Sequence, residues 1–336
     1  MLVAHSIAEL RSRVAPDTRF AVTIGNFDGV HAGHRELIRL TREKAAMQST
    51  VLGRAVPSIL VTFDPHPMHV MRDASWPKLL SPLPRKLELL EKTGIDAVLV
   101  LPFTKVMAAT PAPDFIREIL VETLRATDLV IGFNFALGKG RGGDPAMLRA
   151  LGEVYGFSLT RVPPVVVSEE TVSSTLVRDH IQAGLMEHVI PLLCRMHSVE
   201  GEIVHGKARG RTIGFPTANI DHKNALLPPL GAYATWFQVL SDGQSSPPLH
   251  SMTSIGTNPT FGGGAVTLET NVLDFSGDLY GKTVRLYFAA RLRGEIAFKG
   301  VEALVAQLHN DAAAARAVLR RGNTVSSEHS HVEMLT

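Results

Sequence analysis

The chain of 336 residues has little cysteine, no long hydrophobic run and no block of one charge sign. Its single cysteine, Cys194, excludes an intramolecular disulfide and a zinc cluster of thiolates, and it fits a reducing compartment. No stretch approaches the roughly 20 apolar residues of a membrane span, and the N-terminal segment lacks the apolar core of a signal peptide. The formal net charge is +2, with Lys and Arg spread along the chain. We therefore expect a cytoplasmic protein with no nucleic-acid or membrane partner.

Two common nucleotide-binding motifs are also missing. Residues 281–283 (Gly-Lys-Thr) resemble the end of a P-loop, but Ser276 occupies the position where that motif needs glycine. Glycines within 138–143 match the spacing of the dinucleotide fingerprint, yet they follow the fourth expected strand rather than the first, and no acidic residue follows at the required distance. Any nucleotide site in this chain must therefore use another architecture.

The length and the 45% content of hydrophobic residues predict two globular domains. In the N-terminal part, buried-type strands alternate with helical patterns, which indicates an α/β domain with a Rossmann-like open parallel sheet. Ligands of such sheets bind at the carboxyl ends of the strands. The expected strands are 19–25, 58–64, 95–103 and 128–135, and the expected helices are 34–47, 86–94 and 114–124.

Near residue 198 the pattern changes to short β-prone runs separated by turn residues, and helical periodicity returns at 301–321. This order predicts an antiparallel β-barrel with a terminal helix. We place the boundary within 190–197, which divides the chain into domains 1–190 and 196–320. The polar segment 323–336 is expected to be a disordered tail.

The sharpest N-terminal motif is Gly-Asn-Phe-Asp-Gly-Val-His-Ala-Gly-His at 25–34, between an expected strand and helix. Glycines allow close approach of a ligand, and a helix start offers free N–H groups to a phosphate. His31 and His34 are three residues apart, so both can lie on one face of the first helical turn and donate to phosphoryl oxygens. A zinc site formed with His66 and His69 is an alternative, although structural zinc usually requires thiolates.

Three later segments are weaker candidates when taken alone. Residues 62–67 (Thr-Phe-Asp-Pro-His-Pro) follow a strand, and the Gly-rich loop 132–143 carries Lys139 and Arg141, which could cover a phosphate or a planar ligand. Residues 173–178 (Ser-Ser-Thr-Leu-Val-Arg) place hydroxyls at a helix start with a cation one turn later, which suits a phosphate. An ordinary surface loop and a simple helix cap remain the alternatives for the last two.

In the C-terminal part, the main motif is Gly-Arg-Thr-Ile-Gly-Phe-Pro-Thr-Ala-Asn-Ile at 210–220. Thr217 and Asn219 point to one side of an extended chain, and their oxygens are suitable ligands for Mg²⁺. Glu269 and Asn271 share one face of an expected strand, where a carboxylate could accept a proton from an attacking hydroxyl. A polar turn and a solvated strand carboxylate are the alternatives if either run stood alone.

Together, the N-terminal motifs resemble the nucleotidyltransferase half of the bacterial bifunctional riboflavin kinase/FAD synthetases, whose extended HxGH motif matches 25–34. The resemblance implies that the histidines bind ATP phosphates and that the hydroxyls and arginine of 173–178 close the site. It also implies a flavin-binding side. Leu176 departs from the arginine that is frequent at its position. The ATP-binding residues expected here are Gly25, Phe27, Asp28, Gly29, His31, His34, Ser174, Thr175 and Arg178, with catalytic roles for His31, His34 and Arg178, and the flavin-binding residues are Asp64, Asn134 and Phe135.

The C-terminal motifs resemble the riboflavin kinase domain of the same family, a six-stranded β-barrel, because the Pro-Thr-Ala-Asn signature is intact and later segments follow in the expected order. The resemblance implies that Thr217 and Asn219 hold ATP-bound Mg²⁺, and that Glu269 is the catalytic base for the ribityl 5′-hydroxyl. Asn271 departs from the histidine that is frequent at its position. The loop expected to cover the ATP phosphates contributes Gly206, Lys207 and Gly210.

The resemblance therefore implies two reactions with ATP as co-substrate: riboflavin is phosphorylated to FMN, and FMN is adenylylated to FAD with release of pyrophosphate. Three alternatives are a riboflavin kinase with a degenerate N-terminal half, an adenylyltransferase for another acceptor such as a pantetheine phosphate, and a flavin sensor without turnover. The intact motifs of both halves favour the bifunctional enzyme. Self-association is left undetermined by the sequence.

Overall fold

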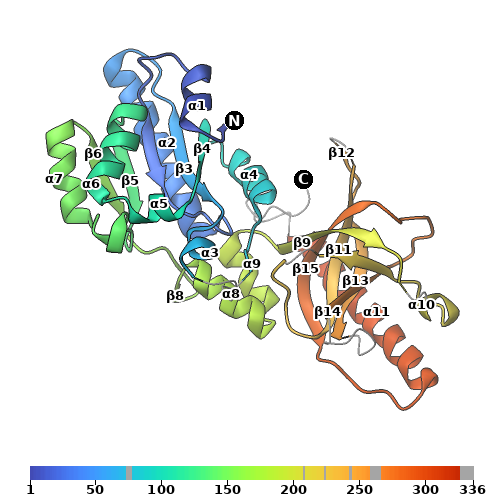
Figure 1. The fold of residues 1–336 in the computed structure, drawn as a ribbon. Helices are drawn as coiled ribbons and strands as arrows, with labels where there is room; N and C mark the ends of the chain where they lie inside the picture. The colour runs from blue at the N-terminus through green and yellow to red at the C-terminus, as the bar shows by residue number, and fades with distance from the viewer. Residues whose placement is uncertain (73–77, 207–208, 223–224, 242–243, 258–265, 326–336) are drawn as a thin grey trace. The chain divides into compact units, whose positions relative to one another are not determined.

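The computed structural model describes residues 1–336 except 73–77, 207–208, 223–224, 242–243, 258–265 and 326–336. Its contacts divide the chain into two compact units, Met1–Ser173 and Ser174–Thr336 (Figure 1). Within the described ranges, no helix is both long and apolar enough to cross a membrane.

The first unit is an α/β fold built on a six-stranded parallel sheet. The strand order is β1-β4-β3-β2-β5-β6. The strands of this unit, with a small hairpin (β7 and β8), are β1 (Leu2–Ala4), β2 (Ala21–Ile24), β3 (Ser58–Asp64), β4 (Ala97–Pro102), β5 (Asp128–Gly132), β6 (Ser158–Val162), β7 (Val166–Val167) and β8 (Glu170–Thr171). Its helices are α1 (Ile7–Arg13), α2 (Ala32–Leu52), α3 (Pro67–Met71), α4 (Leu83–Glu91), α5 (Lys105–Ala109), α6 (Ala112–Phe115), η1 (Ile116–Thr123), η2 (Lys139–Arg141) and α7 (Pro145–Tyr155).

The sheet is buried on both faces, as the nearly continuous apolar composition of its central strands requires. Residues that alternate along β3 enter two different core clusters: Ile59 and Val61 belong to one, and Leu60 belongs to the other. Helices α2 and α4 supply Ile38 and Leu89 to the cluster of Leu60. The cluster on the opposite face is completed by α1, α6, η1 and α7. The Rossmann-like parallel sheet expected from the sequence is confirmed.

Two expectations for this unit need correction. The segment 114–124, expected as one helix, is the end of α6 followed by the π-helix η1, which buries Ile116, Ile119 and Leu120 against the sheet. The wider turns of a π-helix come from i→i+5 hydrogen bonds, as in the bond from the Leu124 N–H to the Ile119 carbonyl. The two edge strands, β1 and β6, were not predicted, because β1 is three residues long and β6 buries only Val162.

The second unit contains a closed antiparallel barrel. Its six strands follow the order β11-β13-β14-β10-β9-β15, and β15 pairs again with β11 to close the ring, while β12 extends from β11. The elements of this unit are α8 (Ser174–Ala183), α9 (Met186–Leu193), β9 (His197–Val204), α10 (Arg209–Thr212), β10 (Ala218–Asp221), β11 (Gly231–Ser241), β12 (Gln244–Ser245), β13 (Leu249–Thr257), β14 (Val266–Val272), β15 (Thr283–Arg293) and α11 (Val301–Val325). The expected six-stranded barrel is confirmed.

Helix α11 packs against β11, β13 and β15 (Figure 1). Small residues allow this close packing: Ala312 and Ala315 are buried in one cluster with Trp236 of β11. A partly buried ion pair between Arg293 and Asp311, 2.8 Å long, joins β15 to the helix. The helix includes 323–325, the first three residues of the expected tail, and 326–336 lie outside the described residues.

The contacts divide the units at Ser173–Ser174, and the expected boundary of 190–197 stays a prediction. The physical reason is the packing of α9 against β9 and β15, which groups the helices α8 and α9 with the barrel. Helical periodicity had assigned this stretch to the preceding α/β pattern.

Candidate active sites

The first candidate site is built from loops that follow three neighbouring strands of the parallel sheet. The loop 25–31 follows β2, the loop 64–67 follows β3, and the Gly-rich loop 132–143 follows β5. Because β3, β2 and β5 are adjacent and parallel, these loops emerge at the same edge of the sheet. β3 lies on one side of β2 in the sheet, and β5 lies on the other. The loops therefore meet at the place where ligands of open α/β sheets bind.

The two histidines lie together at the start of α2. The backbone N–H of His34 donates to Nδ1 of His31 over 3.3 Å, so His31 is the N-cap of the helix. The two rings are stacked with centroids 3.6 Å apart. Since Nδ1 of His31 accepts this bond, a neutral ring carries its proton on Nε2. Both imidazoles therefore lie at a helix N-terminus, which favours negative groups.

Other residues of the same turn have structural contacts that the sequence motif did not reveal. Phe27 is 1% exposed and packs in the core beside Leu60. Asp28 is 2% exposed, and its carboxylate accepts the backbone N–H groups of Leu80 and Ser81 at 3.2 and 3.0 Å. These two side chains support the turn from within the protein, and their expected part in ATP binding stays a prediction.

Two glycines of this turn, Gly25 and Gly29, are needed for different structural reasons. Gly29 has a φ of 87°, in the left-handed region that favours glycine. A side chain at Gly25 would begin 3.2 Å from the Phe27 ring, so this glycine makes room for the buried phenylalanine. Both positions shape the backbone that leads to His31.

A buried lysine behind this turn was missed by the sequence reasoning. Lys86, on α4, is 6% exposed, and its ammonium donates to the Asn26 carbonyl at 3.1 Å and to the Thr62 hydroxyl at 3.2 Å. Burial lowers the pKa of Lys86, while the nearby carboxylates of Asp28 and Asp64 act in the opposite direction. Its signal in the sequence was slight, because Lys86 follows another cation, Arg85, in a short helix whose buried residues also include Leu89 and Leu90.

The flavin-binding residues predicted for this unit lie at the ends of β3 and in the Gly-rich loop. Asp64 and Asn134 are exposed, and Phe135 packs partly against the core cluster of the sheet. Gly138 approaches α6 so closely that a Cβ atom would lie 2.6 Å from the backbone nitrogen of Ala112. This glycine therefore allows close packing against α6.

The motif at 173–178 leads into helix α8 of the second unit. Arg178 is 6% exposed, and its Nη1 donates to the Ser174 carbonyl within the helix at 3.2 Å. Ser174 and Thr175 occupy the first turn, in agreement with the expected helix start. The roles of these three residues at an ATP site stay predictions.

The second candidate site lies where β10 and β14 run side by side in the barrel. Asn219 and Glu269 are paired across the two strands, and Thr217 immediately precedes β10. The Thr217 hydroxyl donates to Oε2 of Glu269 over 3.2 Å. Glu269 is thus brought beside Thr217 and Asn219, which precede it by 52 and 50 positions, and all three residues are partly exposed.

Two glycines allow the preceding loop to pass directly against these residues. A Cβ atom on Gly206 would lie 2.1 Å from Nδ2 of Asn219, and one on Gly210 would lie 2.1 Å from the Phe215 carbonyl. No side chain fits at either position without moving the backbone or the asparagine. Lys207, also expected over the ATP phosphates, lies outside the described residues.

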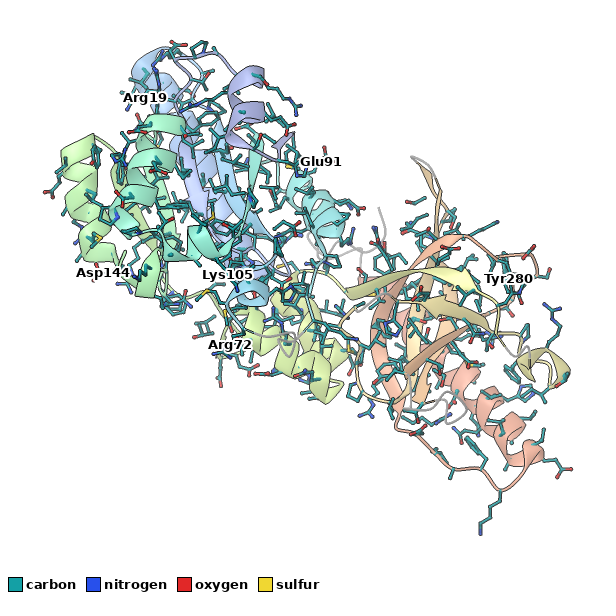
Figure 2. All side chains as sticks on the ribbon, in the orientation of Figure 1. Arg19, Arg72, Glu91, Lys105, Asp144 and Tyr280 are labelled. Atoms are coloured by element: carbon teal, nitrogen blue, oxygen red, sulfur yellow. The ribbon has the colours of Figure 1, made fainter. Side chains whose placement is uncertain are left out.

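Two further contacts at this site were not predicted. His205 stacks on the ring of Tyr280, with centroids 4.0 Å apart, next to Gly206; Tyr280 is labelled in Figure 2. Asn271, two residues after Glu269, donates from Nδ2 to the Pro216 carbonyl over 2.7 Å. The first contact joins segments 75 residues apart in sequence, which no local pattern reveals.

Comparison with known proteins now decides the family. Residues 14–176 match the family model described as FAD synthetase, and residues 193–319 match the model described as riboflavin kinase. The bifunctional riboflavin kinase/FMN adenylyltransferase of Escherichia coli (strain K12) is 36% identical over 302 residues, covering 90% of this chain and 93% of the relative. The chain belongs to the bifunctional riboflavin kinase/FMN adenylyltransferase family.

Other members of the bifunctional family are similar over nearly the same length. The relative from Pseudomonas fluorescens is 36% identical, covering 90% of this chain and 94% of its own, and that from Bacillus subtilis (strain 168) is 32% identical, covering 86% and 89%. A crystal structure of a protein described as a macrolide-efflux protein from Streptococcus pneumoniae is 28% identical with a TM-score of 0.80, covering 94% of this chain and 98% of that one. Both units of the chain thus have counterparts in a single relative.

The residues of the second site fit the magnesium ion that the kinase half of the family implies. A hydroxyl and an amide oxygen, from Thr217 and Asn219, are hard oxygen donors of the kind that Mg²⁺ prefers, and the Glu269 carboxylate lies beside them. Among the residues that the structure describes, no group of three or more His, Cys, Asp or Glu side chains is arranged to hold a metal ion. A zinc site at the histidines, considered from the sequence, therefore gains no support.

Proposed function

We propose that the chain makes FAD from riboflavin in two ATP-dependent steps, one in each unit. The barrel transfers the γ-phosphoryl group of ATP to riboflavin, giving FMN and ADP. The α/β unit transfers the adenylyl group of a second ATP to FMN, giving FAD and pyrophosphate. The observation that carries the proposal is the convergence of Thr217, Asn219 and Glu269 at one place in the barrel, within a chain that matches both family models.

In the first step, Glu269 is the general base. Its carboxylate accepts the proton of the riboflavin 5′-hydroxyl as that oxygen bonds to the γ-phosphorus, and the bond to the β-phosphate oxygen of ADP breaks. The hydrogen bond from Thr217 holds the carboxylate and leaves the lone pairs of the hydroxyl oxygen available to a cation. Mg²⁺, when held by Thr217 and Asn219 with ATP, supplies positive charge that neutralises the phosphates.

In the second step, the chain needs no nucleophile of its own. A phosphate oxygen of FMN attacks the α-phosphorus of ATP, and pyrophosphate leaves, so catalysis consists of positioning and charge neutralisation. The stacked imidazoles of His31 and His34 support this assignment, because they lie at the start of α2, where the helix dipole favours negative groups. Ser174, Thr175 and Arg178 are proposed to complete the phosphate contacts.

The flavin of this second step is proposed to lie against Asp64, Asn134 and Phe135. All three follow strands β3 and β5, whose carboxyl ends flank that of β2. The single cysteine of the chain is compatible with the cytoplasmic setting in which we propose that both reactions occur.

The test is a chromatographic assay of the purified chain with riboflavin, ATP and Mg²⁺ that separates FMN from FAD. We expect FMN to rise first and FAD to follow, with ADP formed from riboflavin and pyrophosphate formed from FMN. FMN without FAD would leave the kinase alone and overturn the adenylyltransferase assignment. Flavin that binds without any product would overturn both assignments and favour a sensor.

A further inference from the structure

Asn271 has a contact at the kinase site that its sequence context does not explain. It lies two residues after Glu269 on β14, so the two side chains leave the same face of the strand. Asn271 is only 8% exposed, and its Nδ2 donates to the Pro216 carbonyl over 2.7 Å. A buried amide that donates a short hydrogen bond to one loop carbonyl fixes that carbonyl in place.

The carbonyl that Asn271 holds belongs to the residue directly before Thr217. Neighbouring side chains of β14 thus hold successive loop residues: Asn271 holds Pro216, and Glu269 accepts the hydroxyl of Thr217. Phe215, on the other side of the proline, is buried in the core cluster beneath α11. The loop is therefore held at three consecutive residues, and because proline has no N–H, its carbonyl is the polar backbone group by which position 216 can be held.

We propose that Asn271 is a positioning residue of the kinase site, which keeps the Thr217 hydroxyl in register with the Glu269 carboxylate through the Pro216 carbonyl. The inference rests on the proposed kinase function. A neutral donor suits this position, because it satisfies the carbonyl without placing a second negative charge beside the base.

This role makes distinct predictions for three substitutions. Asn271→Asp keeps the shape but replaces the donor with an acceptor that faces the Pro216 carbonyl. Asn271→His changes the shape but restores an N–H donor. Asn310→Asp, at an exposed position of α11, is a matched control that adds the same charge elsewhere in the same unit.

The experiment measures kcat and KM for ATP and for riboflavin in the full chain, with FAD formation from supplied FMN as the control in each preparation. A displacement of about 1 Å in a reacting group can cost about 100-fold in rate, so we expect Asn271→Asp to lower the kinase kcat/KM for ATP by about 10- to 100-fold. The KM for riboflavin and the FAD control should stay at the wild-type value. We expect Asn271→His to recover most of the loss and Asn310→Asp to show none.

Several outcomes would overturn the inference. Asn271→Asp with wild-type kinetics would show that the contact with Pro216 does not matter. An equal loss of kinase activity in Asn271→Asp and Asn271→His would indicate simple damage to packing. If Asn271→Asp does not fold, the inference is tested by Asn271→His alone. It then requires that the histidine variant folds and keeps the wild-type KM for ATP. A wild-type chain that forms no FMN would overturn the proposed function itself, which separates the two failures.

Discussion

At the scale of single residues, His31 has two duties that substitution can separate. Its ring caps α2 by accepting the His34 N–H, and it is stacked on the ring proposed to contact phosphate. Asparagine is a good N-cap residue and has no imidazole, whereas alanine removes both functions. A pair of variants at this one position therefore distinguishes helix stability from catalysis.

We predict that His31→Ala lowers the free energy of unfolding by about 1 kcal/mol and that His31→Asn leaves it nearly unchanged. Both variants should lose most FAD formation from FMN, because neither offers the ring N–H to ATP. Urea unfolding and the FAD assay, made on the same samples, check the two effects. Full activity in His31→Asn would show that the cap, rather than the imidazole, is what the first site needs.

At the scale of elements, α4 holds the turn after β2 from behind through Lys86. Burial lowers the pKa of Lys86 below its usual 10.5 in the folded chain. Between the lowered pKa and 10.5, the unfolded chain binds more protons than the folded chain, so this residue makes stability rise with pH. At pH values below the lowered pKa, the buried ammonium lowers the free energy of unfolding by its full desolvation cost.

We predict that the difference in unfolding free energy, wild type minus Lys86→Met, increases as pH rises towards 10.5, by at most about 1.4 kcal/mol per pH unit. Methionine keeps the length of the side chain and has no charge to titrate. Urea unfolding of both proteins at several pH values between neutrality and 10 measures the slope. Parallel curves, or a difference that shrinks with pH, would contradict the burial of a charged Lys86.

The loop before β10 gives a second prediction at this scale. In Gly206→Ala, the new methyl group would begin 2.1 Å from Nδ2 of Asn219, so either the loop or the asparagine must move. We expect the kinase activity to fall by about 100-fold, while FAD formation from FMN is kept. Gly256→Ala on β13 is the control, since its Cβ atom would lie 3.9 Å from the closest atom. Equal kinase activity in the two variants would contradict the proposed role of the loop.

The central strands of the sheet and the presence of a barrel could be predicted because apolar runs, alternation and turn residues are local signals. The edge strands β1 and β6 gave too little of such signal, and the π-helical form of η1 depends on packing against the sheet. Motifs likewise identified Thr217, Asn219 and Glu269, but Lys86 and Asn271 were missed as contacts, since their partners lie 24 or more residues away in sequence. The motif also did not reveal that the Asp28 carboxylate accepts two backbone N–H groups, and the expected part of Asp28 in ATP binding stays a prediction.

At the scale of the whole molecule, the two proposed reactions depend on different catalytic groups. The histidines belong to Met1–Ser173, whereas Glu269 and its neighbours belong to Ser174–Thr336. The account therefore requires that one activity can be removed while the other is kept. It also requires that FMN made by one molecule can be used by another when it is free in solution.

The most direct test mixes two variants, Glu269→Gln and His34→Ala, with riboflavin, ATP and Mg²⁺. Glutamine still accepts the Thr217 hydroxyl but cannot act as a base, and loss of a general base costs about 10²- to 10⁴-fold. Alone, Glu269→Gln should form FAD from FMN and almost none from riboflavin, and His34→Ala should form FMN and stop. The account predicts that the mixture forms FAD from riboflavin. A mixture that forms none, although each variant keeps its remaining activity, would contradict two separate sites linked by FMN.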